Sequence, residues 1–172
     1  GHRLAPPAMT PALTLKVAIL LIAACLVHTR ANSQNVSNKP PSPGAAATCP
    51  AAKLLTAAQI HGQWRVSFQS APAGLPATAT VMLERHAQFG DSVAGFVSRN
   101  LAAPAPGHAA RAQLAGDLED GFLTLDESSN GISITGIWNA EVVEGSCGRS
   151  VRGTWKDTSN HAPPDAPEIS FT

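Results

Sequence analysis

The sequence predicts an all-β protein: an eight-stranded antiparallel up-and-down barrel, preceded by a short helix and an N-terminal signal segment. Three observations predict this fold. Beyond residue 59, apolar and polar residues alternate in short runs, which is the period of a half-buried strand. Two dipeptides typical of tight hairpins, Asp120-Gly121 and Asn130-Gly131, separate some of these runs. An apolar-x-Gly-x-apolar pattern recurs along the runs and contains all 3 tryptophans.

Residues 1–33 are predicted to comprise upstream residues and an export signal that starts at Met9. The apolar stretch Val17 to Val27 is too short to span a bilayer comfortably. A small-x-small site before Gln34 would release a soluble mature chain. The run that ends at Cys25 also matches a bacterial lipobox, which would make Cys25 a lipidated first residue and would bring in a membrane. The apolar residues after Cys25 favour soluble export. We therefore expect a periplasmic or secreted protein, with an envelope lipoprotein as the alternative.

Residues 34–48 are rich in Pro, Ser, Asn and Ala and are predicted to be a linker. The barrel domain is then 49–172. It begins with Cys49 to Gln59, whose composition suits a short helix. The predicted strands share a period of two, and they are 60–69, 77–86, 91–99, 110–119, 122–127, 132–143, 149–157 and 168–172.

The turn dipeptides also predict how neighbouring strands pair. If Asp-Gly and Asn-Gly are two-residue loops, Gly116 faces Leu125, and Leu125 faces Gly136. If Glu144-Gly145 forms the next turn, Gly136 faces Gly153. Glycine weakens a strand unless it allows sharp coiling or leaves space for a large neighbour. We infer that these glycines relieve crowding inside a tightly curved sheet and that tryptophan rings lie over the space.

Alternation divides the strand residues between an inner and an outer face. The predicted inner face is Ile60, Trp64, Val66, Phe68, Val81, Leu83, Val93, Val97, Leu114, Leu118, Leu123, Leu125, Ile132, Ile134, Trp138, Val151, Trp155, Ile169 and Phe171. Four apolar residues fall on the polar face, where a cluster would mark a protein contact patch: Met82, Phe96, Phe122 and Ile137. Four charged residues alternate in step with the inner-face residues, but they lie only at strand ends, where we expect a solvated rim: Arg85, Arg99, Asp120 and Glu127.

The cysteines predict a disulfide. Removal or acylation of Cys25 leaves Cys49 and Cys147, an even pair in an oxidising compartment. The bond would close a loop of about 100 residues, worth about 4 kcal/mol in the chain-entropy model.

Charge and residue spacing exclude several functions. The formal net charge is +0 with 14% charged residues, so no basic stripe supports nucleic-acid binding. The central inner face carries no acid–base pair, which predicts a non-enzymatic protein without a cofactor. No metal site is expected, because the histidines after the linker lack ligand spacing and are expected to be solvated. They are His61, His86, His108 and His161.

The helix followed by Gly62-x-Trp64, with Trp138 and Trp155 on late strands, resembles the calycin-like small barrels, the lipocalin and avidin-like group. The resemblance covers about residues 54 to 172, and the chain also resembles uncharacterised exported proteins of Gram-negative bacteria. It implies a small apolar ligand held in the barrel by these three tryptophans, and the inner-face Leu125 joins the candidate ligand-binding residues.

Two alternatives to a ligand-binding barrel stay open. A small disulfide-tied barrel with an N-terminal arm is similar to bacterial metalloprotease inhibitors, which implies an exported protease inhibitor. A barrel with a filled interior implies an envelope structural or interaction protein, with Phe96 and Phe122 as the candidate contact for a protein partner. Small eight-stranded barrels are either solid or hold one ligand. The choice therefore depends on whether the interior is full.

Overall fold

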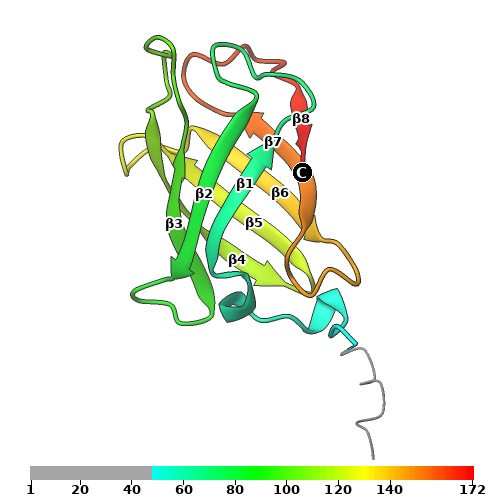
Figure 1. The fold of residues 1–172 in the computed structure, drawn as a ribbon. Coiled ribbons are helices and arrows are strands. Elements are labelled where there is room, and N and C mark those ends of the chain that lie inside the picture. The colour runs from blue at the N-terminus through cyan, green and yellow to red at the C-terminus, as the bar shows by residue number, and fades with distance from the viewer. Residues whose placement is uncertain (1–47) are drawn as a thin grey trace, which may run out of the picture. The chain divides into compact units, whose positions relative to one another are not determined.

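A computed structural model describes residues 48–172, so the predicted signal segment and almost all of the predicted linker lie outside the described residues. The described part contains one antiparallel sheet in the sequential order β1 to β8, which confirms the all-β up-and-down prediction (Figure 1). Its strands are β1 Gly62–Ser67, β2 Thr78–Arg85, β3 Ser92–Ser98, β4 Arg111–Glu119, β5 Phe122–Ser128, β6 Gly136–Val142, β7 Val151–Asp157 and β8 Glu168–Phe171. Within residues 48–172, no helix has the length and apolarity needed to cross a membrane.

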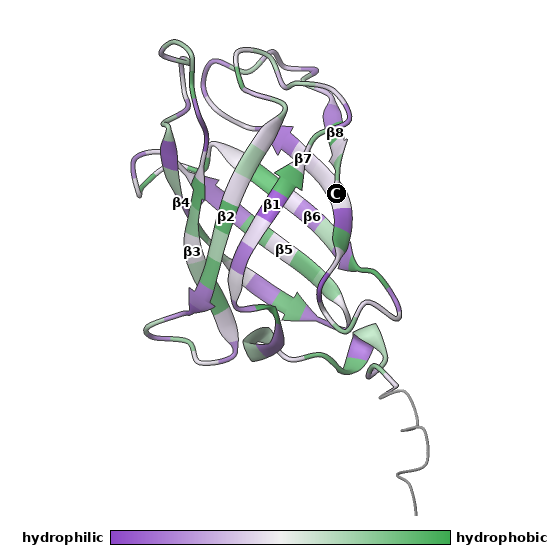
Figure 2. Cartoon of the chain, viewed as in Figure 1, coloured by the Kyte–Doolittle hydropathy of each residue, from purple (hydrophilic) through white to green (hydrophobic). Residues whose placement is uncertain are grey.

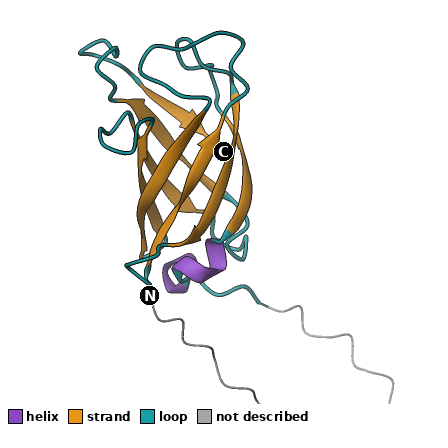
Figure 3. Cartoon of the chain, turned by 90° about the vertical axis from the view of Figure 1, so that its left-hand side faces the viewer, coloured by secondary structure: helices purple, strands orange, loops and turns teal. Residues whose placement is uncertain are grey.

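The sheet curls into a half-barrel (Figure 3). Its first and last strands meet at one end. Ser67 and Thr172 exchange two backbone hydrogen bonds of 2.8 and 3.0 Å. Nearby, the Gln69 N–H donates to the Ser170 carbonyl oxygen at 2.9 Å. These bonds involve only the end of β1 and the residues just after it. We call the line between β1 and the β7–β8 side of the sheet the seam.

The predicted helix over Cys49–Gln59 is replaced by two short 3-10 helices, η1 Ala52–Leu54 and η2 Ala57–Ile60. The first 3-10 helix ends before Leu55, which is extended, and the second begins after Thr56, which is also extended. Thr56 caps the second helix, because its N–H donates to Gln59 Oε1 at 2.8 Å. Local capping chemistry thus divides a segment whose composition alone favours one helix.

The Cys49–Cys147 disulfide is present, as predicted, and joins residues 98 positions apart. It attaches the segment that carries η1 and η2 to the loop between β6 and β7. Leu55 and Ile60 of this segment are buried, and Leu55 packs close to Gly148 beside the disulfide. The N-terminal segment therefore covers one end of the curled sheet (Figure 3).

The first predicted hairpin is confirmed. Gly116 pairs with Leu125 across β4 and β5. Asp120 and Gly121 both have positive φ, 50° and 83°, as the expected two-residue turn requires.

The second predicted hairpin has a different register: Leu125 faces Trp138, and Gly136 faces Glu127. The Asn130 side chain causes the change. Its Oδ1 accepts backbone N–H groups two and three residues further on, both at 2.9 Å. This local loop delays the start of β6 to Gly136. The shift is two residues, so the side chains of β6 keep their predicted faces.

The third predicted pairing is also wrong, because Gly136 faces Asp157, and Trp138 faces Trp155. The chain between β6 and β7 makes a wider loop, in which the Val143 N–H donates to the Ser150 carbonyl oxygen at 2.9 Å. The register shift is again an even number of residues, and an even shift leaves every side chain on the same face of the sheet. The predicted inner face is therefore correct although the predicted register is not.

The core lies on the predicted inner face, and hydrophobic residues alternate with polar ones along the strands (Figure 2). Buried apolar side chains come from all eight strands. Ile132 and Ile134 are the exceptions among the predicted inner residues, with 89% and 47% exposure. Both precede β6, in the loop that Asn130 organises.

The in-strand glycines allow two kinds of close contact. A Cβ at Gly136 would lie 2.5 Å from Trp155 Nε1, so the predicted indole over a glycine is confirmed there. A Cβ at Gly116 would overlap the carbonyl oxygen of Thr124, and one at Gly153 would overlap that of Asn139. At these two positions, the missing side chain lets the backbone of the next strand approach, which the sequence did not predict.

We expect Gly116→Ala to lower the free energy of unfolding by about 1–3 kcal/mol, the usual cost of overpacking. The added methyl would meet backbone, which cannot rotate away as a side chain can. Urea denaturation measures the loss. Ala115→Ser is the matched control, because Ala115 is the exposed neighbour on the same strand. Equal stabilities for the two variants would contradict the close strand contact.

Candidate functional site

The inner face contains a buried ion pair. Arg99 follows β3 and Glu127 lies in β5, and neither side chain is exposed, so the predicted solvated rim is wrong for this pair. Arg99 Nη1 donates to Glu127 Oε1 at 2.6 Å, and Nη2 donates to Oε2 at 2.7 Å. This two-point contact is the strongest form of arginine–carboxylate pairing.

Two tryptophans complete the environment of Glu127. Trp138 Nε1 and Trp155 Nε1 donate to Glu127 Oε2 at 3.0 and 3.1 Å. The Arg99 guanidinium carbon lies 5.9 and 5.8 Å from the centres of the same rings. We call Arg99, Glu127, Trp138 and Trp155 the Glu127 cluster. Each carboxylate oxygen has a donor, which offsets the cost of burying the charge.

The sequence held a signal for this cluster. A buried indole N–H usually needs an acceptor. Glu127 is one of the few acceptors that the alternation places on the same face of the sheet as the tryptophans. Strand pairing then brings them together: Trp138 and Trp155 are cross-strand partners, and Gly136 opposite Glu127 leaves room for the Trp155 ring.

The predicted ligand-binding residues lie in the core. Trp155 is 1% exposed and Trp138 2% exposed, and Phe68 packs on both rings at 5.7 to 6.0 Å between centroids. Trp64 is half-buried, and its Nε1 donates to the Ile60 carbonyl oxygen at 2.9 Å.

Trp64, Leu125 and Trp138 do line a common internal cavity, but it measures only about 30 Å³. The other lining residues are Val66, Val81, Leu83, Leu123, Ala140, Val151 and Phe171. A space of this size holds one or two water molecules, whereas sites for small ligands measure about 300–1,000 Å³. Side chains therefore fill most of the interior.

His108 forms a second buried polar contact, so it is not the solvated histidine that its sequence spacing predicts. Its Nε2 lies 3.0 Å from Asp157 Oδ2, and its side chain is 2% exposed. Asp157 Oδ1 accepts the Ser159 N–H at 2.8 Å. Burial raises the pKa of Asp157, but the hydrogen bonds from His108 and Ser159 outweigh it and leave the pKa below its ordinary 3.8.

A lowered pKa means that ionised Asp157 stabilises the fold above the pKa of the unfolded chain. This contribution disappears as the pH falls through the folded pKa. We expect Asp157→Asn to cost about 1 kcal/mol at pH 7, the net value of one hydrogen bond. Urea unfolding should show the difference from wild type shrinking below about pH 4. Asp165→Asn at an exposed site is the control. A difference that stays constant down to pH 2.5 would contradict the assignment.

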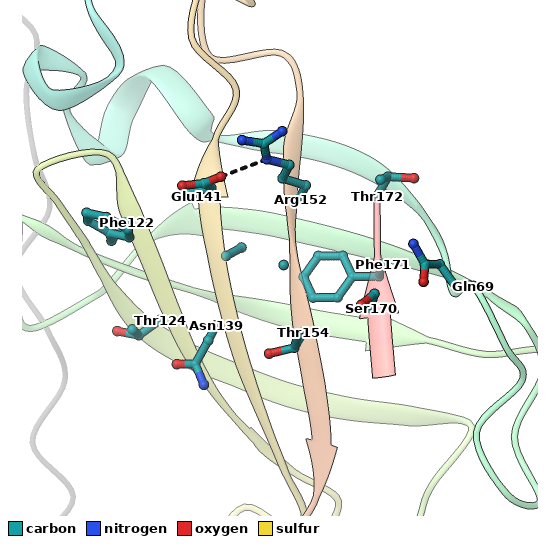
Figure 4. A pocket seen from close by; sticks show the side chains of 12 residues that line it. Gln69, Phe122, Thr124, Asn139, Glu141, Arg152, Thr154, Ser170, Phe171 and Thr172 are labelled. Carbon is teal, nitrogen blue, oxygen red and sulfur yellow. Dashed lines mark hydrogen bonds and ion pairs between the residues drawn. The ribbon is translucent and has the colours of Figure 1, made fainter. Parts of the chain in front are cut away.

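A groove of about 700 Å³ lies on the outer face of β5 to β8 (Figure 4). One row of cross-strand partners along it is hydrogen-bonding and uncharged: Thr124, Asn139, Thr154 and Ser170. Exposed Phe122 and the Glu141–Arg152 ion pair, 2.7 Å between Nε and Oε1, line another part. Gln69 and Thr172 line the side of the groove that lies opposite Phe122 (Figure 4).

Phe96 and Phe122 do not form one patch. Phe96 pairs with Met82 on β2, and the Arg111 guanidinium carbon lies 3.6 Å from the centre of its ring. Phe122 lies two strands away, at the start of β5. It is 59% exposed and belongs to the outer groove.

Fold and site define a small up-and-down β-sheet protein with a filled interior and an external groove. Within residues 48–172, no three His, Cys, Asp or Glu side chains gather as metal ligands would. The sequence matches no family model, and no curated protein matches it.

Proposed function

We propose that the protein is an exported, non-enzymatic binding protein of calycin-like architecture that acts through its outer groove. The contrast in volume carries the proposal: the groove measures about 700 Å³ and the internal cavity about 30 Å³. The Cys49–Cys147 disulfide and the predicted export signal support a location outside the cytoplasm.

The groove favours a protein partner from the envelope. Exposed aromatic side chains are frequent anchors in protein interfaces, and Phe122 offers one beside a row of hydroxyl and amide groups. Among the side chains that line the groove, only Glu141 and Arg152 are charged, and they neutralise each other. The groove therefore suits a partner surface that combines an apolar side chain with uncharged polar groups.

The test compares Phe122→Ala with Phe89→Ala in crosslinking and pull-down from periplasmic extract. Phe89 is 62% exposed in the loop between β2 and β3 and serves as the control for lost apolar surface. Loss of an anchor costs about 2 kcal/mol or more, which is about a thirtyfold loss in affinity. Partners captured equally by both variants would contradict the proposal.

Apolar ligand binding inside the sheet is tested separately. Under our proposal, tryptophan fluorescence does not respond to a panel of fatty acids and other hydrophobic compounds, because the interior is filled. A saturable shift of the emission would instead favour the ligand-binding function.

A protease inhibitor is the second candidate. The disulfide favours it by fixing Cys49, the residue that follows the 34–48 lead-in, to the sheet domain. Deletion of 34–48 should then abolish inhibition of a co-secreted metalloprotease while leaving the stability of the domain unchanged. Absence of inhibition by the undeleted protein would remove this candidate.

A further inference from the structure

The loop between β5 and β6 carries a reactive dipeptide, Asn130-Gly131. Both residues are exposed to solvent. The carboxamide carbon of the asparagine, Cγ, is an electrophile, and the backbone nitrogen of the next residue is a nucleophile that can close a succinimide ring with it. Glycine places no Cβ beside this nitrogen. The loop therefore presents Asn130 Cγ and the Gly131 nitrogen next to each other in the chain, open to water.

Two backbone groups of the same loop polarise the Asn130 carboxamide. Its Oδ1 accepts the Ile132 and Ser133 N–H groups, both at 2.9 Å. When a nucleophile attacks Cγ, negative charge develops on Oδ1. Backbone N–H donors about 2.7–3.1 Å from such an oxygen are the arrangement of an oxyanion hole. Hydrogen bonds to a charged oxygen are about twice as strong as those to a neutral one, so these two bonds stabilise the transition state more than the ground state.

Neighbouring hydrogen bonds hold the two donors in place. Ser128 Oγ donates to the Ser133 carbonyl oxygen at 2.7 Å. The Thr135 N–H donates to the Glu127 carbonyl oxygen at 2.7 Å and closes the loop just before β6. Donors that are fixed in advance do not have to reorganise when charge develops, and this is what makes an oxyanion hole effective.

From these observations, we propose that Asn130 is a self-modification site, at which the loop promotes deamidation of its own asparagine. The Gly131 nitrogen attacks Asn130 Cγ and gives its proton to water, and the carboxamide nitrogen leaves as ammonia. Water then opens the succinimide. Cleavage between the Gly131 nitrogen and Cγ gives aspartate, and cleavage between that nitrogen and the main-chain carbonyl carbon gives isoaspartate. The overall reaction consumes one water and releases one ammonia. This site is separate from the outer groove and from the proposed function.

The two donors also influence which product forms. In the succinimide, Oδ1 remains bonded to Cγ, beside the Ile132 and Ser133 N–H groups. Polarisation of this carbonyl directs the attacking water to Cγ, so aspartate is favoured over isoaspartate. The aspartate carboxylate can accept the same two N–H groups, and the loop keeps its conformation.

Isoaspartate has a different effect on the loop. It lengthens the main chain by a methylene group and moves Oδ1 away from its donors. Ser129, the preceding residue, accepts the Ala109 N–H at its Oγ and donates to the Gly107 carbonyl oxygen, each at 3.2 Å. We therefore expect faster amide hydrogen exchange at Ala109, as well as in the modified loop, in the isoaspartate form alone.

The test follows deamidation of the folded chain at neutral pH by peptide mapping, with synthetic aspartate and isoaspartate peptides as standards. The reference is a synthetic peptide of residues 126–137, which contains the dipeptide without the folded loop. We expect the folded chain to convert about threefold faster than the peptide or more, with a higher ratio of aspartate to isoaspartate. Exposed Asn160 in the loop between β7 and β8 is the internal control and should stay unmodified over the same period.

Substitution of Ser133 tests the donors. Ser133→Pro removes one N–H group and should slow conversion about tenfold or more. Ser133→Ala keeps the N–H group and should convert at the wild-type rate, and tryptophan fluorescence checks that both variants fold. If Ser133→Pro does not fold, the comparison of folded chain and peptide decides alone. The proposal is overturned if the folded chain converts more slowly than the peptide, if the two give the same product ratio, or if folded Ser133→Pro converts as fast as Ser133→Ala.

Discussion

Replacing Glu127 by alanine will lower the free energy of unfolding by about 3–5 kcal/mol, the cost of leaving a buried charge without its partner. The Arg99 guanidinium would lose both hydrogen bonds in a site where its side chain is not exposed. The N–H groups of Trp138 and Trp155 would lose their acceptor in the same substitution. Guanidinium chloride denaturation followed by tryptophan fluorescence measures the effect.

Asp126→Ala is the matched control, because Asp126 is the preceding carboxylate on β5 and is exposed. We expect a change within about 0.5 kcal/mol there. Glu127→Gln keeps an acceptor and the side-chain volume. Its loss of unfolding free energy should therefore fall between those of Asp126→Ala and Glu127→Ala. The double variant Arg99→Met with Glu127→Leu should lose less than Glu127→Ala, because it leaves no unpaired charge. A cost below about 1 kcal/mol for Glu127→Ala would refute the buried cluster.

The alternation of apolar and polar residues along the strands predicts the fold. Side chains change face every residue, so the apolar positions of the strands identify the inner face without any knowledge of pairing. The register of β4 and β5 is also predictable, because Asp120-Gly121 fits only a short loop with positive φ. The register after the Asn130 loop could not be predicted. The Asn130 side chain accepts hydrogen bonds from two backbone N–H groups, which a tight hairpin would arrange differently.

The Glu127 cluster was missed for a related reason. A strand end predicts solvent exposure only if no loop or neighbouring side chain covers it. Glu127 lies near the end of β5, but Arg99 reaches it from the chain beyond β3. Contacts between residues 28 positions apart depend on how loops fold over the sheet, and alternation carries no information on that. The same holds for His108 and Asp157, which are 49 positions apart.

Removal of the Cys49–Cys147 disulfide should cost about 4 kcal/mol, since the bond closes a loop with a separation of 98 residues. The expected loss is large because the bond restricts the unfolded chain and also holds the N-terminal segment on the sheet. Without it, Ile60 and Leu55 must keep their buried positions through packing alone. We therefore expect the segment 48–60 to become sensitive to protease before the sheet unfolds.

The measurement compares wild type with a Cys49→Ser, Cys147→Ser variant, both carrying Cys25→Ala so that no other thiol can exchange. In thermal and urea unfolding, the double-serine variant should be much less stable than the parent. A reducing agent should lower the stability of the parent to that of the variant. The reductant should not change the variant itself, which controls for effects unrelated to the bond. Equal stability of parent and variant would mean that packing of η1 and η2, rather than the disulfide, holds this end of the sheet.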